Sequence, residues 1–158
     1  MAYDKSGENW HGPRTAIEEL PSTSEWRNVS LTSNVRSIIA QDGTNSTTGG
    51  SLPSNFSYSG KAARLLTTQE INKACGIEAG HWITGELDTC NYLMENTKYS
   101  NANIANWGYW LENPHSGRSG HAWRVNGNSR YVNNDTVSDA GNRGVRPAIE
   151  VLKSNIEY

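Results

Sequence analysis

Polar, hydrogen-bonding side chains are concentrated between Gly108 and Val151 and give this stretch its chemical character. They alternate with short runs of aromatic and β-branched residues, a pattern typical of strands joined by turns. Turns on a rigid scaffold are a common location for binding residues. We therefore predict a ligand-binding face made by Asn113, His115, Arg118, His121, Arg124, Asn126, Asn128, Arg130, Tyr131, Asn133 and Asn134.

The arrangement of that face follows from a hairpin at Asn126-Gly127, a dipeptide typical of two-residue turns. Alternate residues of a strand point to the same side of a sheet. Arg124 and Asn126, and then Asn128 and Arg130, are therefore expected to share one side. Tyrosine and arginine, both present here, are types that often dominate binding energy.

Enzymatic chemistry has little support among the titratable side chains. His115 and His121 could face one site together with Glu112 or Asp135. No pattern of nucleophile, base and acid accompanies them, and lone histidines more often have surface or structural roles. The motifs H-E-x-x-H and G-x-S-x-G and a phosphate-binding glycine loop do not occur. We predict a binding protein and not an enzyme.

Composition and charge limit the kinds of binding partner that the chain can have. The chain has 158 residues, of which 35% are hydrophobic, and a mean hydropathy of -0.71. This length fits one domain, and six Trp and seven Tyr argue for a folded chain. A net charge of -2 gives no electrostatic basis for binding nucleic acid or an anionic membrane. No apolar run is long enough to span a bilayer.

The two cysteines, Cys75 and Cys90, have two interpretations. They form a disulfide, which would stabilise the chain by roughly 3 kcal/mol in the loop-entropy model, or they are reduced core residues. A metal site is disfavoured because neither belongs to a C-x-x-C pair. We predict the disulfide, which indicates an oxidising, extracellular setting.

Periodicity and turn signals predict the elements that position these residues. Thr67 and Glu70 form a capping box at the start of a helix that runs to about Ala74. Gln41–Ser59, rich in Gly, Ser, Thr and Asn, is expected to be a flexible linker. Together, the expected helices and strands predict an α+β domain with Trp110 and Trp123 in its core. Further helices are expected over Pro13–Leu20 and Leu87–Asn96, and strands over Trp26–Leu31, Val35–Ala40, Ala122–Val125, Ser129–Asn133 and Val145–Leu152.

Four segments resemble a known family: RLLTTQEI, GYWLENP, AWRV and, most specifically, GVRPAIEV. They are similar to bacterial domains of the C-type-lectin fold, in the branch that holds formylglycine-generating-enzyme-like domains, variable proteins of diversity-generating retroelements and pilin-like surface proteins. The resemblance implies an α+β fold of two helices, small antiparallel sheets and long loops. It places a C-type-lectin-like core with the ligand-display face at residues 61–158. Residues 1–60 match nothing in the family and are expected to pack on the same domain as strands and loops.

The resemblance also implies a function. It suggests a surface-displayed, adhesin-like domain that binds a protein or a glycan on another cell or surface. Retroelement-diversified members vary at codons that yield Asn, Ser, Tyr, Asp, His, Arg and Gly, which are the types between the scaffold positions here. A structural pilin-like tip or spacer without a specific ligand is the alternative. Both imply a bacterial, extracellular or cell-surface location, with the anchor outside this sequence.

The chain departs from the family at two chemical sites. Formylglycine-forming members use a cysteine pair late in the domain, whereas both cysteines here precede the polar stretch. Animal C-type lectins bind sugar through calcium at Glu-Pro-Asn, whereas the order here is Glu112-Asn113-Pro114. This triplet and Asn133–Asp135 offer oxygens that suit calcium, but a proline-stabilised turn is the simpler interpretation. We predict no cofactor, with calcium as the alternative.

Arg146, within GVRPAIEV, stands between apolar neighbours and precedes Pro147. A guanidinium offers planar donors that suit backbone carbonyls or a carboxylate. We interpret Arg146 as a structural residue beneath the hairpin.

Overall fold

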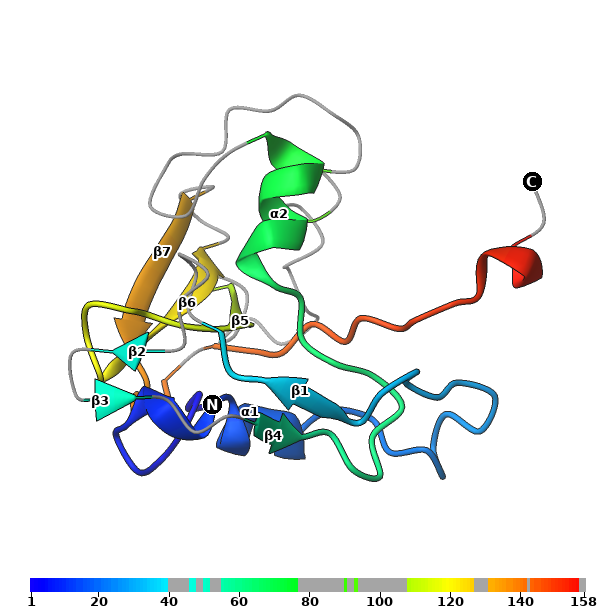
Figure 1. Cartoon of the computed structure of the whole chain (residues 1–158), viewed down its shortest axis with the longest axis horizontal. Coiled ribbons are helices and arrows are strands. Elements are labelled where there is room, and N and C mark those ends of the chain that lie inside the picture. Colours follow the sequence, from blue (N-terminus) through cyan, green and yellow to red (C-terminus); the bar gives the residue numbers. More distant parts are fainter. Residues whose placement is uncertain are drawn as a thin grey trace.

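The computed structural model describes residues 1–39, 46–47, 50–51, 55–76, 90, 93, 108–126, 131–141 and 143–156 (Figure 1). It is a mixed domain of small helices and small antiparallel sheets, so the predicted α+β class is confirmed. The predicted helix over Leu87–Asn96 lies outside the described residues except for Cys90 and Leu93. The helices and strands are η1 (Asn9–His11), α1 (Arg14–Glu18), β1 (Val35–Ser37), β2 (Ser46–Thr47), β3 (Gly50–Ser51), β4 (Asn55–Ser57), α2 (Thr68–Cys75), β5 (Tyr109–Pro114), β6 (His121–Asn126), β7 (Tyr131–Thr136) and η2 (Lys153–Asn155).

The central sheet has three antiparallel strands in the order β5-β6-β7. β6 and β7 pair without interruption from His121↔Thr136 to Asn126↔Tyr131, which confirms the predicted hairpin strands. The β5–β6 register shifts between Trp110 and Pro114. This irregularity falls at the Glu-Asn-Pro triplet, where a proline cannot donate to the ladder.

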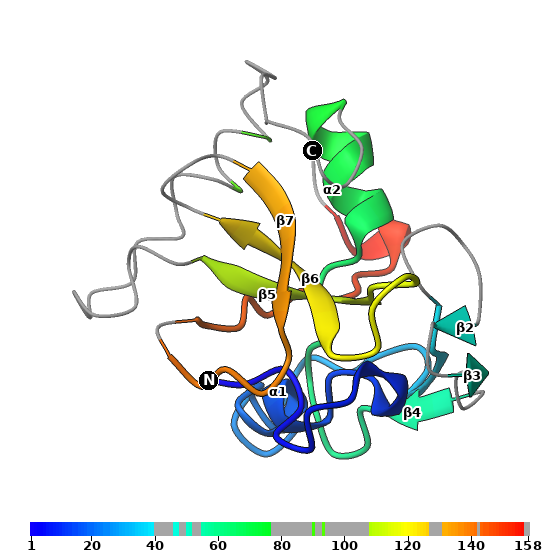
Figure 2. The ribbon, with the colours of Figure 1, turned by 90° about the vertical axis from the view of Figure 1, so that its left-hand side faces the viewer.

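Both faces of the central sheet are covered (Figure 2). On one face, α2 packs in a cluster with Tyr109, Leu111, Trp123, Val125 and Val132. On the other, Trp110, Ala122 and Val137 pack against the N-terminal part of the chain, including Tyr3, Ala16, Ile17, Leu20, Tyr58 and Leu65. Trp110 and Trp123 are both buried, as predicted. Consecutive residues of β5 and β6 therefore enter two different cores, as the alternation of a strand requires.

The ends of α2 follow the local sequence. The Thr67 hydroxyl accepts from the Glu70 amide at 3.1 Å, and the Glu70 carboxylate accepts from the Thr67 amide at 2.8 Å, which confirms the capping box. The helix ends at Gly76, whose φ of 66° is left-handed. Cys75 is bonded to Cys90, so the predicted disulfide is confirmed.

Two predicted strands are wrong. The segment 26–31 forms turns, because the amides of Trp26 and Val29 donate to carbonyls three or four residues earlier. In 145–152, Pro147 lacks an amide hydrogen, and the pairing seen among the described residues is an isolated bridge of Ala148 with Arg64. A second isolated bridge joins Gly144, just before this segment, to Tyr109.

The end of the predicted linker 41–59 is also structured. β4 pairs with β1 in the register Val35↔Ser57, Arg36↔Phe56 and Ser37↔Asn55. This pairing confirms a strand within Val35–Ala40. Tyr58 is fully buried, so its ring fixes this part of the chain to the core. Part of the interval, residues 40–45, 48–49 and 52–54, lies outside the described residues.

Candidate functional site

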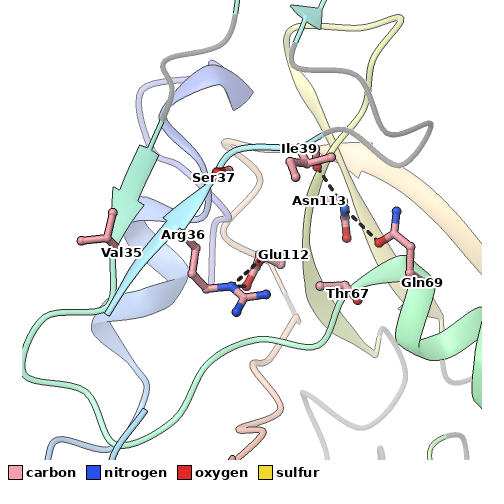
Figure 3. Close-up of a pocket in the computed structure, with 8 residues that line it drawn as sticks. All are labelled: Val35, Arg36, Ser37, Ile39, Thr67, Gln69, Glu112 and Asn113. Carbon is pink, nitrogen blue, oxygen red and sulfur yellow. Dashed lines mark hydrogen bonds and ion pairs between the residues drawn. The ribbon is translucent and has the colours of Figure 1, made fainter. Parts of the chain in front are cut away.

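A cleft of about 570 Å³ separates β1 from β5 and the start of α2 (Figure 3). β1 and the residues after it form one wall, and α2 and β5 form the other. The cleft thus joins three parts of the chain that are far apart in the sequence. Its lining consists of Val35, Arg36, Ser37, Ile39, Thr67, Gln69, Glu112 and Asn113.

An ion pair between Arg36 and Glu112 spans the cleft. The Arg36 Nε atom lies 3.0 and 2.9 Å from the two Glu112 carboxylate oxygens. The Tyr58 hydroxyl donates to the same carboxylate at 2.9 Å. Burial raises the pKa of the Glu112 carboxyl above its usual range, while Arg36 and Tyr58 act in the opposite direction. The carboxylate is therefore a buried charge that depends on Arg36.

The ion pair belongs to a longer charged network. The Arg36 guanidinium also lies 3.7 Å from a Glu150 carboxylate oxygen. Glu150 accepts from Arg64 Nε at 2.9 Å, and Arg64 Nη2 lies 2.6 Å from Glu70. The network links β1, the start of α2 and the segment after Ala148, and so holds both walls of the cleft in place.

Asn113 connects the two walls of the cleft. Its side-chain oxygen accepts from the Thr68 amide at 2.8 Å. Its Nδ2 donates to the Ile39 carbonyl at 3.0 Å, on the opposite wall (Figure 3). Nδ2 also lies 3.3 Å from the Gln69 side-chain oxygen. Asn113 is only 4% exposed. Its expected place on an exposed face is therefore wrong, because this amide satisfies buried main-chain groups.

Replacing Asn113 with Ala should lower the free energy of unfolding by about 1–3 kcal/mol, because a buried amide and a carbonyl lose their partner. Urea unfolding of the purified chain measures this change. Gln69→Ala is the matched control, since Gln69 is exposed and its loss leaves both main-chain bonds of Asn113 intact. Equal losses in the two variants would contradict this role of Asn113.

One edge of β1 lies along the cleft without a strand partner among the described residues. The Tyr58 amide donates to the Asn34 carbonyl at 2.7 Å, so the pair Asn34–Tyr58 is hydrogen-bonded. Antiparallel pairs alternate between bonded and non-bonded, so the backbone groups of Val35 and Ser37 point away from β4. The Val35 carbonyl accepts from the Ser33 hydroxyl. Within the part of the chain that the structure describes, the Val35 amide and both backbone groups of Ser37 have no hydrogen-bond partner, so another strand could pair with them.

The predicted ligand-binding face is divided by the fold. The register places Arg124, Asn126, Tyr131 and Asn133 on one side of the hairpin, so the predicted common side of Arg124 and Asn126 is confirmed. That side, however, faces the N-terminal core. Arg124 is 3% exposed and its Nε lies 3.0 Å from Asp135, which also pairs with Arg143. The expected exposure of Arg124 is therefore wrong, because its charge is buried in an ion-pair cluster.

The other members of that face have mixed environments. Arg118 is exposed, whereas His115 and His121 are half-buried. The His115 ring stacks on Trp123, with centroids 5.3 Å apart and planes 7° apart. Asn126, Tyr131, Asn133 and Asn134 are half-buried. Asn128 and Arg130 lie outside the described residues.

Arg146 contacts the core as a structural residue would. Its Nη1 donates to the Leu93 carbonyl at 3.2 Å, and its guanidinium lies 5.6 Å from the centre of the Tyr109 ring. The expected bond to a backbone carbonyl is confirmed.

The calcium alternative gains no ligand set from Glu112 and Asn113, because their side-chain oxygens accept from Arg36, Tyr58 and the Thr68 amide. In the described part of the chain, no three His, Cys, Asp or Glu side chains gather in a way that could hold a metal ion. No helix in that part combines the length and apolarity needed to cross a membrane.

Sequence reasoning did not identify the β1 wall of the cleft. Arg36 and Glu112 are 76 residues apart, and Arg36 belongs to no recognisable motif. The one available signal was Glu112 itself, an acid following the aromatic and aliphatic residues of YWL. Comparisons with protein-family models, curated proteins and solved structures find no match to this chain.

Proposed function

We propose that this chain is an extracellular recognition domain that binds an extended polypeptide segment along the open edge of β1. The supporting observation is the coincidence of that edge with the cleft: the outward backbone groups of Val35 and Ser37 lie where the lining residues leave space. A peptide bound in this way adds a strand, and main-chain hydrogen bonds supply its affinity.

The chemistry of the cleft suits a peptide. Val35 and Ile39, at 55% and 43% exposure, offer apolar contact beside the edge. The Arg36–Glu112 pair and the Asn113 amide form a polar floor whose side chains are already fixed by partners. A preorganised site of this kind binds without a large cost of ordering. The disulfide between Cys75 and Cys90 fits an extracellular protein.

The resemblance to C-type-lectin-fold domains implies ligand contacts on the turns beyond β5 and β6, and we propose that adhesin-like face as the second candidate. Arg118 is exposed there, and His115 is held flat against Trp123. Rigid aromatic stacking beside an exposed arginine is a favourable setting for a binding contact. If a retroelement diversifies this protein, the varied residues would lie on this face. A pilin-like spacer without a specific ligand would need neither this face nor the β1 edge.

The test pans a displayed library of random peptides on the purified chain and compares two proline variants. Ser37→Pro removes an amide that points away from β4, so the β1–β4 pairing is retained while the open edge is blocked. Ser57→Pro is the matched control, because its amide points to the opposite edge of the same ribbon. We expect Ser37→Pro to weaken the selected peptides at least tenfold and Ser57→Pro to leave their binding unchanged.

The melting temperatures of both variants show whether the fold is retained. Selected peptides that bind Ser37→Pro as tightly as the unaltered chain, but lose binding to Arg118→Ala, would move the site to the second candidate. A library that yields no binder would leave the peptide-recognition proposal without support and overturn it.

A further inference from the structure

The segment that follows Ala148 carries apolar side chains that the domain does not bury. Ile149, Val151, Leu152 and Ile156 are 44%, 51%, 63% and 45% exposed. Figure 1 shows this segment leaving the body of the domain. Four large exposed apolar residues within eight positions are unusual for an isolated surface, and such patches mark interaction sites.

The start of this segment is hydrogen-bonded to the domain, and Val151 and Leu152 line a small cavity with the segment 28–32. The Ala148 backbone exchanges hydrogen bonds of 2.8 and 2.9 Å with Arg64. The Glu150 carboxylate accepts from Arg64 and from the hydroxyl and amide of Thr32. Leu152 and Ile156 have extended backbones, separated by the single 3₁₀ turn of η2. Within residues 151–156 the backbone is extended at Leu152 and Ile156, and the side chains of Val151, Leu152 and Ile156 are apolar and exposed.

This segment and the β1 edge are complementary. The edge offers the outward amide of Val35 and both outward backbone groups of Ser37 beside two exposed apolar side chains. The segment offers exposed apolar side chains, with extended backbone at Leu152 and Ile156. We propose that residues 151–156 of one copy of the chain add as a strand to β1 of a second copy. This inference rests on the peptide-binding function proposed above and names its partner.

The pairing joins two copies because the segment cannot readily reach its own β1. Glu150 is tied to Arg64 and Thr32, and the chain beyond it lies beside the segment 28–32, whereas the cleft at β1 has a different lining. The contact joins two different surfaces, the cleft of one copy and the segment of another, so it is heterologous. Each copy carries both surfaces. An added strand needs an extended backbone, so η2 must unwind when the segment binds. Its single 3₁₀ turn has few hydrogen bonds, so unwinding costs little free energy.

The test is a complementation experiment by sedimentation velocity. Ser37→Pro blocks the edge and keeps the segment, whereas Leu152→Asp spoils the apolar segment and keeps the edge. Both positions are exposed, so neither change should unfold the chain. We expect the unaltered chain to exceed monomer mass as its concentration rises and each variant alone to stay monomeric. An equimolar mixture of the two variants should form a 1:1 dimer.

A Ser57→Pro chain should associate like the unaltered one, since its outward amide lies on the far edge of the ribbon. An unaltered chain that stays monomeric at millimolar concentration overturns the inference. So does association that survives in both single variants. If the chain stays monomeric while library peptides still require Ser37, the inference fails and peptide recognition stands. If no peptide binds either, both fail.

Discussion

Replacement of Trp110 by alanine is expected to lower the free energy of unfolding by about 3–5 kcal/mol, the range for removing a buried tryptophan. Trp110 is fully buried and makes three kinds of contact. Its Nε1 donates to the Met1 carbonyl at 2.9 Å, and its ring meets Tyr3 edge-on at 5.7 Å. The Arg143 guanidinium lies 5.4 Å from the ring centre. The alanine variant loses all three and leaves a cavity.

Trp26→Ala is the matched control for this loss. Trp26 is 41% exposed, and exposed substitutions usually change stability by no more than about 0.5 kcal/mol. Urea unfolding, followed by far-ultraviolet circular dichroism because both variants lose a tryptophan, gives the two free energies. Similar losses of unfolding free energy in the two variants would mean that Trp110 is not tightly packed between β5 and the N-terminal part of the chain.

The features that sequence reasoning predicted well are those with a local cause. The capping box joins Thr67 to Glu70, three residues apart, and the hairpin strands repeat their pattern every two residues. Each can be recognised within a short window because the interacting groups are near neighbours. The disulfide was one of two interpretations, and the structure decides between them.

The features that could not be predicted depend on which faces are covered. Alternation placed Arg124 and Asn126 on one side of the hairpin, but it cannot say whether that side meets solvent or a second core. Here residues from the first third of the chain cover it, and Asp135 compensates the charge of Arg124. The cleft has the same origin, since the partners of Glu112 and Asn113 come from Arg36 and Ile39. Such contacts have no signature in a single sequence.

The other large effect is expected at Arg36. Arg36→Ala removes the cation that faces Glu112, whose side chain is only 8% exposed. A carboxylate left unpaired in a buried site is strongly destabilising, so we expect a loss of about 3 kcal/mol at pH 7, the lower end of the range for a buried pair because Arg36 itself is partly exposed. The double variant Arg36→Ala/Glu112→Gln should recover part of this loss, since no charge is then buried.

The loss of stability in Arg36→Ala should also depend on pH, and the direction of that dependence identifies the buried Glu112 charge as its cause. The pKa of Glu112 is raised in the folded chain, so over the interval between its unfolded and folded values the folded state binds more protons, and stability falls as pH rises. Removing Arg36 extends this interval upward. The gap in unfolding free energy between Arg36→Ala and the unaltered chain should therefore shrink as pH falls from 7 towards 5.

The carboxylates of Glu70 and Glu150 show whether the pH dependence is specific to Glu112. Burial acts to raise the pKa values of Glu70 and Glu150, but the charge of Arg64 and the hydrogen bonds from Arg64, Thr67 and Thr32 together lower them. Their contribution to stability has the opposite sign and is lost on acidification. All the chains compared keep the residues whose hydrogen bonds lower these two pKa values. The double variant should accordingly differ from the unaltered chain by an amount that changes less with pH. A pH-independent gap for Arg36→Ala alone would show that Arg36 supports the cleft by packing and not by compensating the charge of Glu112.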